Sequence, residues 1–441
     1  MALPFTIEKM VYGGDGLARY VPDEVEISPR PSTKAKAHRG KTVLLPFVLE
    51  GEHVEANIVE EDRGFVRARV EKIVSPSSHR IQPGCPYFGE CGGCHYQHSS
   101  YQHQLEIKVA VLRETLLRTA KIDWQDRIHV HASPPWNYRN RTRMKLQAQP
   151  FTIGYYRFGS HNLLPVEQCP ISSPLINRAL AAVWKLGSSG GLGGLAEMEF
   201  FVDAADAQLL IEIYLPLGEA HDSELKKLAE DLAALIPEIA GIVFFAAGRD
   251  GSSRAISAFG DQELVYQTAS ASYRVSAGSF FQTNRFMVHE LTELVTAGRR
   301  GAIALDLYAG VGLLTVPLAK NFEKVEAVES APSSCADLRR NVPANVMAHR
   351  TTTETFLAKL PSSMKNVGHA VVDPPRAGLG DKTATLLTKL SAHLTYLSCD
   401  PATLARDLKT LVAGGYRIEA IHLIDLFPQT FHIESAVFLA R

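Results

Sequence analysis

The chain has 441 residues, a formal net charge of −1 and six cysteines. This length exceeds what one hydrophobic core usually serves, so we expect two or three domains. A nearly neutral chain is not a general polycation, and any nucleic-acid surface must therefore be a local patch. No apolar stretch is long enough to span a bilayer and the first residues lack a signal-peptide pattern, so we expect a soluble, cytoplasmic protein.

Residues 1 to about 76 alternate between apolar and polar side chains with the period of a β-strand, most clearly over 52–59 and 64–70. We therefore expect a small N-terminal β-barrel. Such a barrel either binds an oligonucleotide or serves as a compact appendage. Acidic residues roughly balance basic ones here, so the pattern does not decide between the two.

Three of the six cysteines lie within ten residues, in a C-x5-C-x2-C pattern, and a fourth follows much later. The four are Cys85, Cys91, Cys94 and Cys169. Six cysteines are too few for a disulfide scaffold of this size, so the crowding favours a metal ion or a cluster. Zinc is a competing interpretation, because His95 and His98 lie close by, although paired CxxC knuckles are absent.

Apolar residues at helical spacing predict an amphipathic helix over about 101–119, which we expect to pack on the catalytic domain. The following segment, 137–157, carries five basic residues and no acidic one. Four of them share one face of a predicted strand: Arg139, Arg141, Arg143 and Lys145. A solvated strand face is the commoner explanation of such spacing. The lack of carboxylates within the segment nevertheless favours a phosphate-bearing partner.

From about residue 280, short apolar runs alternate with helical stretches, which predicts a doubly wound α/β sheet of the Rossmann-like class. The run 305–313 is a strand, a glycine turn and the start of a helix, where the backbone can approach a ligand closely. Glu329 ends the next strand, where a carboxylate can accept the hydroxyls of a ribose. The third glycine of a nicotinamide fingerprint is missing, so the turn favours S-adenosylmethionine over a dehydrogenase cofactor.

Cys399 ends an apolar, strand-like run and precedes Asp400 and Pro401. These two residues suit the N-cap and first turn of a helix, whose dipole should favour a thiolate at Cys399. The alternative is a small apolar side chain that fills space at a strand end. Another buried strand, 370–372, runs into Asp373, so the two strand ends can bring a thiol and a carboxylate to one rim.

Six segments together resemble the RNA uracil-C5 methyltransferase family, and the resemblance extends over nearly the whole chain. They are the cysteine pattern at 85–94 and the segments 280–284, 305–313, 373–376, 398–401 and 427–434. The chain is similar to the branch with an N-terminal TRAM barrel and a [4Fe-4S] cluster, which mainly modifies ribosomal RNA. The resemblance therefore implies RNA as partner, most simply 23S rRNA, with no obligate protein partner evident.

The resemblance also assigns roles to individual residues. Cys399 would add to uracil C6, the C5 carbon would then attack the methyl group of S-adenosylmethionine, and Glu434 would remove the C5 proton. The donor would be held by Gln282, Tyr308, Gly310, Glu329 and Asp373. The cluster, a structural staple, would be held by Cys85, Cys91, Cys94 and Cys169. The expected domains are a barrel at 1–76, a cluster-bearing β-rich region at 77–279 and a catalytic domain at 280–441.

Three alternatives remain open. A tRNA uridine is a possible substrate in place of 23S rRNA. RNA cytosine-C5 methylation is the nearest rival in mechanism, although those enzymes place a cysteine beside the proline of the motif that begins here at Asp373. The third is an iron-sulfur sensor that binds RNA without turnover.

Overall fold

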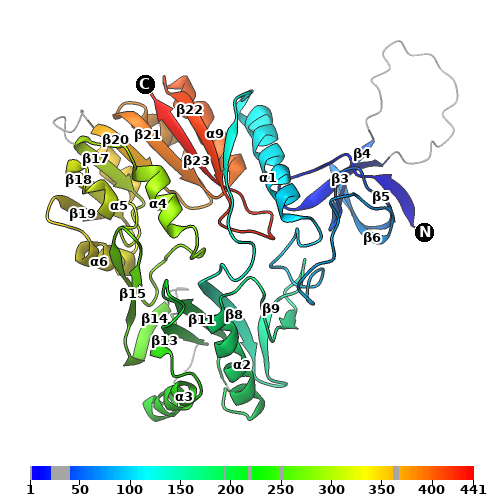
Figure 1. Cartoon of the computed structure of the whole chain (residues 1–441), viewed down its shortest axis with the longest axis horizontal. Helices are drawn as coiled ribbons and strands as arrows, with labels where there is room; N and C mark the ends of the chain where they lie inside the picture. Colours follow the sequence, from blue (N-terminus) through cyan, green and yellow to red (C-terminus); the bar gives the residue numbers. More distant parts are fainter. Residues whose placement is uncertain (1, 21–39, 193, 217–220, 249–252, 361–366) are drawn as a thin grey trace. The chain divides into compact units, whose positions relative to one another are not determined.

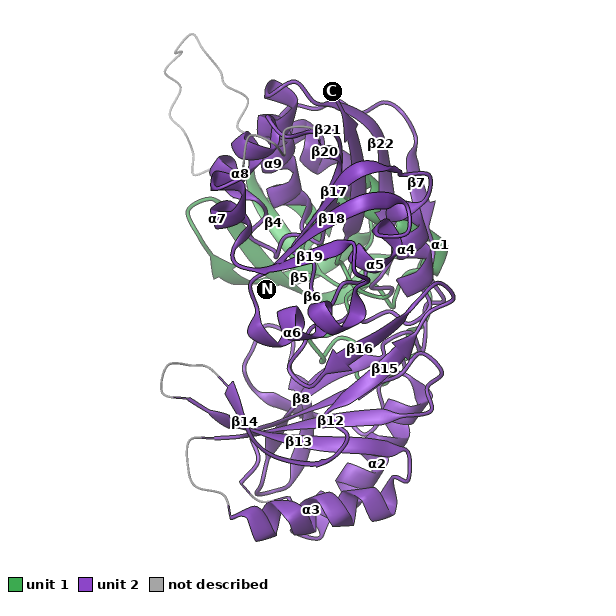
Figure 2. Ribbon diagram, turned by 90° about the vertical axis from the view of Figure 1, so that its left-hand side faces the viewer, with its two compact units in different colours: residues 1–111, 429–432 green, residues 112–428, 433–441 purple. Residues whose placement is uncertain are grey.

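The computed structural model describes residues 2–20, 40–192, 194–216, 221–248, 253–360 and 367–441. Contacts divide the chain into two compact units, coloured separately in Figure 2. The N-terminal unit comprises Met1–Val111 and Gln429–His432, and the C-terminal unit comprises Leu112–Pro428 and Ile433–Arg441. The three-part domain division stays a prediction. No helix among the described residues is long and apolar enough to cross a membrane.

The N-terminal unit contains a six-stranded sheet with the order β1-β5-β6-β4-β3-β2. Its strands are β1 (Leu3–Thr6), β2 (Lys9–Met10), β3 (Asp15–Tyr20), β4 (Lys41–Pro46), β5 (His53–Glu61) and β6 (Phe65–Ser75). Alternate residues of β5, such as Val54 and Ala56, are buried in the core, while His53 and Glu55 are exposed. The period-2 pattern is therefore real, and the sheet is consistent with the predicted TRAM-like barrel. Residues 21–39 of that prediction lie outside the described residues.

The predicted helix over 101–119 is present as α1 (Tyr101–Thr115), followed by one π-helical turn, η1 (Leu116–Ala120). Leu112 and Leu116 are buried as expected, but Leu117 is 45% exposed. A π-turn has more residues per turn than an α-helix, so it rotates Leu117 off the apolar stripe. Within the C-terminal unit, η1 contacts α9 (Pro401–Ala413).

The C-terminal unit contains a seven-stranded central sheet of order β10-β9-β8-β11-β12-β13-β14. The strands are β8 (Arg141–Gln147), β9 (Thr152–Tyr156), β10 (Leu163–Pro165), β11 (Glu197–Val202), β12 (Leu209–Leu215), β13 (Ile239–Ala247) and β14 (Ser253–Gly260). Two helices, α2 (Pro174–Ser188) and α3 (Asp222–Leu235), pack on each other and on this sheet (Figure 1). A hairpin of β15 (Glu263–Gln267) and β16 (Ser272–Ser276) follows.

The remainder forms an eight-stranded sheet of order β19-β18-β17-β20-β21-β23-β22-β7. Its strands are β7 (Ile128–His131), β17 (Gly301–Leu307), β18 (Phe322–Glu329), β19 (Val346–Arg350), β20 (Val367–Val372), β21 (Ser391–Ser398), β22 (Arg417–Ile424) and β23 (Glu434–Ala440). Strands β17 to β21 are mutually parallel, and β23 is antiparallel to both of its neighbours. We call it the catalytic sheet below.

Helices cover both faces of the catalytic sheet. Figure 2 shows α7, α8 and α9 on one face, and α4 and α5 on the other. Their bounds are α4 (Val288–Thr296), α5 (Thr315–Leu318), α6 (Pro332–Asn341), α7 (Thr353–Ala358) and α8 (Gly380–Leu387). The predicted Rossmann-like α/β fold is therefore confirmed. In such sheets ligands bind beyond the carboxyl ends of the parallel strands. Tyr308, Glu329, Asp373 and Cys399 all lie at such ends.

Candidate active site

The register of the catalytic sheet brings three predicted site residues to one edge. Ser398 lies opposite Ser435 in the antiparallel pair of β21 and β23, so Cys399 follows β21 at the end where Glu434 begins β23. Val372 lies opposite Tyr396 in the parallel pair of β20 and β21, so Asp373 leaves β20 at the same edge. Cysteine and two carboxyls, separated in the sequence, therefore converge at the carboxyl ends of the parallel strands.

The helix start after Cys399 is as predicted. Helix α9 begins at Pro401, and the Asp400 side chain accepts hydrogen bonds from the backbone N–H groups of Ala402 (3.0 Å) and Thr403 (2.9 Å). Asp400 is therefore a true N-cap, and it satisfies two of the free backbone donors at the start of the helix.

The expected low pKa of Cys399 is wrong. The thiol is half-buried, and burial, followed by the charges of Glu434 and Asp373, raises its pKa to about 11. Arg376 acts in the opposite direction but is outweighed. The helix dipole acts only over short distances, and here its capping residue is itself an anion. The resting structure therefore holds Cys399 as a neutral thiol at neutral pH.

The two neighbouring carboxyls are themselves shifted. Glu434 is 8% exposed, and burial, together with the charge of Asp373, raises its pKa well above the usual value. Burial raises the pKa of Asp373 to about 6. A carboxyl with a raised pKa is a stronger base when ionised, and Asp373, with a pKa of about 6, can exchange a proton near neutral pH. The edge therefore offers a thiol and two proton-exchanging groups side by side.

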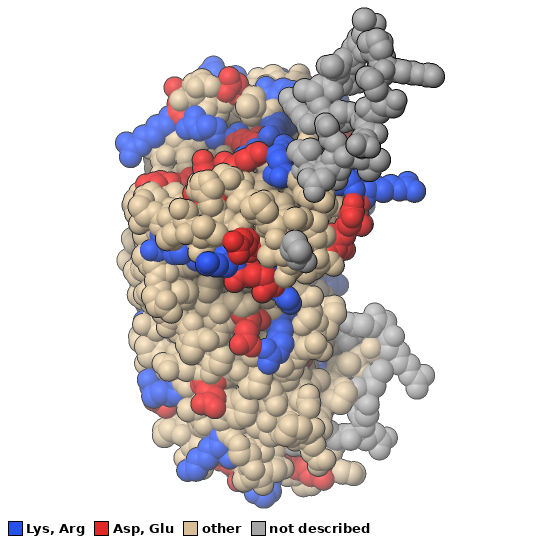
Figure 3. Space-filling view, turned by 90° about the vertical axis from the view of Figure 1, so that its right-hand side faces the viewer, with Lys and Arg blue, Asp and Glu red and all other residues tan. Residues whose placement is uncertain are grey.

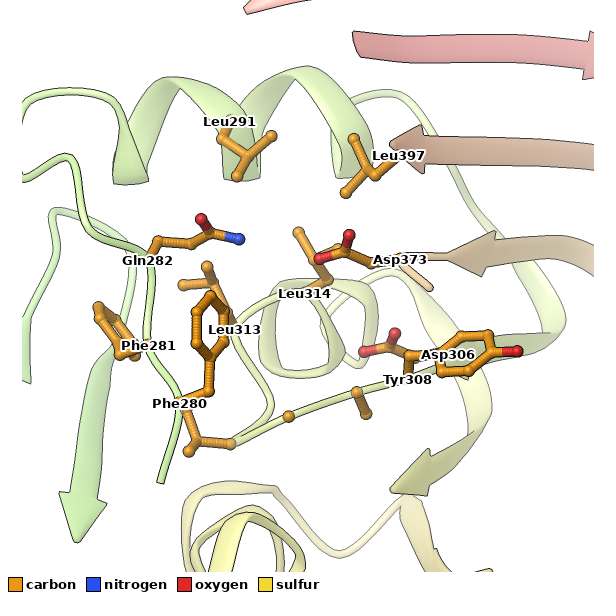
Figure 4. Close-up of a pocket in the computed structure, with 13 residues that line it drawn as sticks. Phe280, Phe281, Gln282, Leu291, Asp306, Tyr308, Leu313, Leu314, Asp373 and Leu397 are labelled. Carbon is orange, nitrogen blue, oxygen red and sulfur yellow. The ribbon is translucent and has the colours of Figure 1, made fainter. Parts of the chain in front are cut away.

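A pocket opens at the same edge, between the loop before α4 and the ends of β17 and β20. Figure 4 shows the carboxyl groups of Asp306 and Asp373 and the amide of Gln282 directed toward its interior. It is lined by Phe280, Phe281, Gln282, Leu291, Asp306, Tyr308, Ala309, Gly310, Val311, Leu313, Leu314, Asp373 and Leu397. Four of the five residues predicted to hold the methyl donor thus line one cavity: Gln282, Tyr308, Gly310 and Asp373.

Glu329, the fifth predicted residue, does not line this pocket. Its carboxylate accepts hydrogen bonds from the backbone N–H groups of Gly310 (2.9 Å) and Ala331 (2.6 Å). The turn it fastens is unusual, because Tyr308 and Gly310 both have left-handed backbones, with φ of 72° and 57°. Glu329 therefore shapes the glycine turn in this structure, and its contact with a ribose stays a prediction.

Asp306 is a pocket residue to which the sequence analysis gave no separate role. It is fully buried, and the hydroxyl of Thr315 donates to it at 2.5 Å. Burial, followed by the charges of Asp373 and Glu329 and opposed by the Thr315 hydrogen bond, raises its pKa to about 7. The available signal was an acidic residue inside an otherwise apolar strand, since a charged side chain there is rarely buried without a function.

We expected the basic stripe to have no carboxylate partners. This is wrong for the three of its residues that lie on β8: Arg141, Arg143 and Lys145. Carboxylates of the adjacent strands lie against them, because β11 pairs with β8 so that Glu199 is opposite Arg143 and Glu197 is opposite Lys145. The ion pairs are Arg141 with Glu199 and Glu212, Arg143 with Glu199 and Glu197, and Lys145 with Glu197. On the face drawn in Figure 3, basic and acidic side chains are likewise interspersed.

The four predicted cluster ligands are all half-buried. Cys85, Cys91 and Cys94 belong to the N-terminal unit and Cys169 to the C-terminal unit. The backbone N–H of Cys169 donates to Asn177 Oδ1 at 2.8 Å. Among the described residues, no group of three or more histidine, cysteine, aspartate or glutamate side chains is arranged to hold a metal ion.

Comparison with known proteins gives a consistent result. The family model described as tRNA (uracil-5-)-methyltransferase matches residues 100–441. An uncharacterized RNA methyltransferase of Aquifex aeolicus is 31% identical, over 99% of this chain and 98% of the relative. The 23S rRNA (uracil(1939)-C(5))-methyltransferase RlmD of Pectobacterium atrosepticum is 30% identical, over 91% of this chain and 90% of the relative.

Among solved structures, the chain is similar to the tRNA (uracil-54, C5)-methyltransferase of Pyrococcus abyssi, which was solved with S-adenosyl-L-homocysteine. The TM-score is 0.74 and the sequence identity 23%, and the match covers 100% of both chains. At this identity the likeness establishes a shared fold.

Proposed function

This chain belongs to the tRNA (uracil-5-)-methyltransferase family, and from that premise we propose that it methylates C5 of a uridine in RNA with S-adenosylmethionine as donor. The observation that carries the proposal is the convergence of Cys399, Glu434 and Asp373 at one edge of the catalytic sheet, beside a pocket that can take the donor.

The first step is addition of the Cys399 sulfur to uracil C6, because C5 of uracil is a poor nucleophile on its own. The electron pair of the C5–C6 double bond moves into an enolate, and C5 then attacks the methyl carbon of the donor. The bond between that carbon and the donor sulfur breaks, which leaves S-adenosylhomocysteine. Since Cys399 rests as a thiol with a pKa of about 11, its proton must pass to the neighbouring Asp373 carboxylate or to solvent as the sulfur adds.

Glu434 is the proposed base for the last step. It removes the proton from C5, the C5–C6 double bond re-forms, and the Cys399 sulfur is expelled. Burial raises the pKa of Glu434, which makes its carboxylate a stronger base for this proton.

Asp373, Gln282, Tyr308 and Gly310 are the proposed binding residues for the donor, because they line the pocket next to Cys399. The donor carries a positive sulfonium group. A cation beside Asp373 would offset one of the two carboxylates that raise the pKa of Cys399, so donor binding would favour the thiolate.

Ribosomal RNA is the proposed substrate. Its support is the 30% identity to a 23S rRNA methyltransferase over nine-tenths of both chains. A tRNA uridine is the second candidate, favoured by the match of residues 100–441 to the family model described as tRNA (uracil-5-)-methyltransferase. The two are separated by measuring transfer of labelled methyl groups to unmodified 23S rRNA and to unmodified tRNA.

The mechanism is tested with RNA that contains 5-fluorouridine and with S-adenosylmethionine. Fluorine at C5 cannot be removed as a proton, so the wild-type chain should form a covalent adduct that survives denaturing electrophoresis. Cys399→Ala should form none. RNA with 5-fluorocytidine is the control for cytosine chemistry and should stay unlinked. RNA binding by the wild type without any adduct would contradict the mechanism and favour a non-catalytic sensor.

We also propose a [4Fe-4S] cluster held by Cys85, Cys91, Cys94 and Cys169. The support is their spacing and their thiol chemistry, which suits iron. Bound there, the cluster would serve as a structural staple, because methyl transfer needs no electrons. Anaerobically purified protein should contain about four iron atoms and four labile sulfides per chain, and Cys91→Ser should lose them. Stoichiometric zinc in the wild type would instead establish the competing metal.

A further inference from the structure

The segment Gln429–His432 connects β22 to β23 of the catalytic sheet, yet by its contacts it belongs to the N-terminal unit, as the colours of Figure 2 show. It ends two residues before Glu434. The position of the proposed base therefore depends on a stretch of backbone whose partners lie more than three hundred residues away.

Gln429 makes four hydrogen bonds that hold this segment. Its backbone carbonyl accepts hydrogen bonds from the N–H groups of His95 and Tyr96, both at 2.9 Å. The Gln104 side chain bonds both the side chain and the backbone of Gln429: Gln104 Nε2 donates to Gln429 Oε1 at 2.9 Å, and the backbone N–H of Gln429 donates to Gln104 Oε1 at 3.0 Å. Both glutamines are buried, with 3% and 1% exposure.

The backbone of Gln429 is left-handed, with φ of 69°. Residues other than glycine, asparagine and aspartate seldom adopt this conformation, and it persists only where the surroundings impose it. Here the surroundings are the four hydrogen bonds to residues 95–104. The adjoining Phe431 ring adds edge-to-face contacts with Tyr12, at 5.5 Å between ring centroids, and His95, at 4.6 Å.

We propose that Gln104 and Gln429 form a clasp that positions Glu434 for proton removal. They are positioning residues, because they act through the backbone between Gln429 and Glu434 and touch neither the base nor the reacting atoms. Cys399 lies at the end of another strand, β21, outside the stretch of backbone from Gln429 to Glu434. The clasp therefore acts on the elimination step and leaves addition and methyl transfer unaffected. This inference rests on the proposed role of Glu434.

Gln104→Leu tests the clasp, since it keeps the size of the side chain and removes its hydrogen bonds. Turnover should fall at least about tenfold, because a small misplacement of a catalytic group is costly. Adduct formation with 5-fluorouridine RNA, which does not need the base, should stay within about twofold of wild type. On ordinary RNA the methylated covalent adduct should accumulate, because its breakdown is slowed.

Gln429→Gly is the second variant, in case the first folds poorly. Glycine adopts the left-handed backbone without strain and keeps the carbonyl that His95 and Tyr96 bond, so only the side-chain pair is lost. The matched control is Gln102→Leu on the same helix, because Gln102 is exposed. It should leave turnover, adduct formation and adduct breakdown unchanged.

Two results would overturn the clasp. One is an equal loss of adduct formation and turnover in both variants, which would indicate a general structural role. The other is unchanged adduct breakdown. Hydrogen exchange at the amides of 429–434 gives a readout that does not depend on activity, and it should be faster in Gln104→Leu. A wild-type chain that forms no adduct would refute the proposed function, whereas unchanged exchange at these amides would refute the clasp.

Discussion

The central sheet and the carboxyl edge of the catalytic sheet both bury acidic side chains, but they surround them differently. In the central sheet, burial raises the pKa of Glu199, yet the adjacent Arg141 and Arg143 outweigh it and hold the pKa below its usual value. At the catalytic edge, burial is the largest influence on Asp306, Asp373 and Glu434 and raises the pKa of all three. Two guanidinium partners thus lower the pKa of Glu199, whereas burial raises the pKa of Glu212, which pairs with Arg141, as it does at the catalytic edge. Carboxyls whose pKa burial has raised can carry protons.

The largest expected effect concerns the carboxyls at the catalytic edge. Glu434→Gln removes the proposed base without changing the size of the side chain. Turnover should fall by about 10²- to 10⁴-fold, the usual contribution of a general base. The methylated covalent adduct should accumulate, because addition and methyl transfer precede the missing step. Denaturing electrophoresis with labelled RNA measures both quantities. A variant that lost turnover without accumulating adduct would place Glu434 earlier in the reaction.

Arg141→Leu tests what the buried ion pairs of the central sheet contribute to stability. Arg141 is 9% exposed and pairs with Glu199 and Glu212, so its loss leaves two buried carboxyls without this cation. The free energy of unfolding at pH 7 should fall by about 3–5 kcal/mol. The control is Lys145→Ala, whose ion pair with Glu197 is partly exposed and should be worth at most about 1 kcal/mol. Urea denaturation measures both, and equal losses would contradict the assigned difference in burial.

Asp306→Asn, unlike Arg141→Leu, should increase the free energy of unfolding, because the wild-type carboxyl destabilises the folded chain when it is ionised. The pKa of Asp306 is about 7 in the folded chain and near 3.8 when unperturbed. The folded state therefore binds the proton more tightly, and wild-type stability falls as pH rises from about 4 through 7. At pH 8 the variant should be more stable by on the order of 2–4 kcal/mol. At pH 3 the difference should vanish, and thermal melting at both pH values checks the trend.

The fold and the site differ in how much of them could be predicted. The catalytic sheet, Asp373 and the cap at Asp400 are predictable because local apolar runs and turn residues carry the signal. The pairing of β8 with β11 is not, since the carboxylates that neutralise Arg143 and Lys145 come from a strand about fifty residues later. The bond between Gln104 and Gln429 spans 325 positions, and no local pattern marks it.

The pKa of the Cys399 thiol is another property that the local sequence does not predict. It also leads to the prediction with the smallest expected effect. A helix start and a cysteine predict a thiolate, but burial raises the pKa, and so does the charge of Glu434, which reaches the site through the pairing of β21 with β23. With a pKa of about 11 and neither RNA nor donor present, the thiolate fraction rises about tenfold per pH unit from 7 to 9. Alkylation of the Cys399 peptide by iodoacetamide, followed by mass spectrometry, should rise in proportion. Addition of S-adenosylmethionine should raise the rate at pH 8, because a cation beside Asp373 offsets one of the opposing charges. A rate that is already constant above pH 7 would instead mean that the helix terminus outweighs both carboxyls, and the catalytic edge would then stabilise a charge just as the central sheet does.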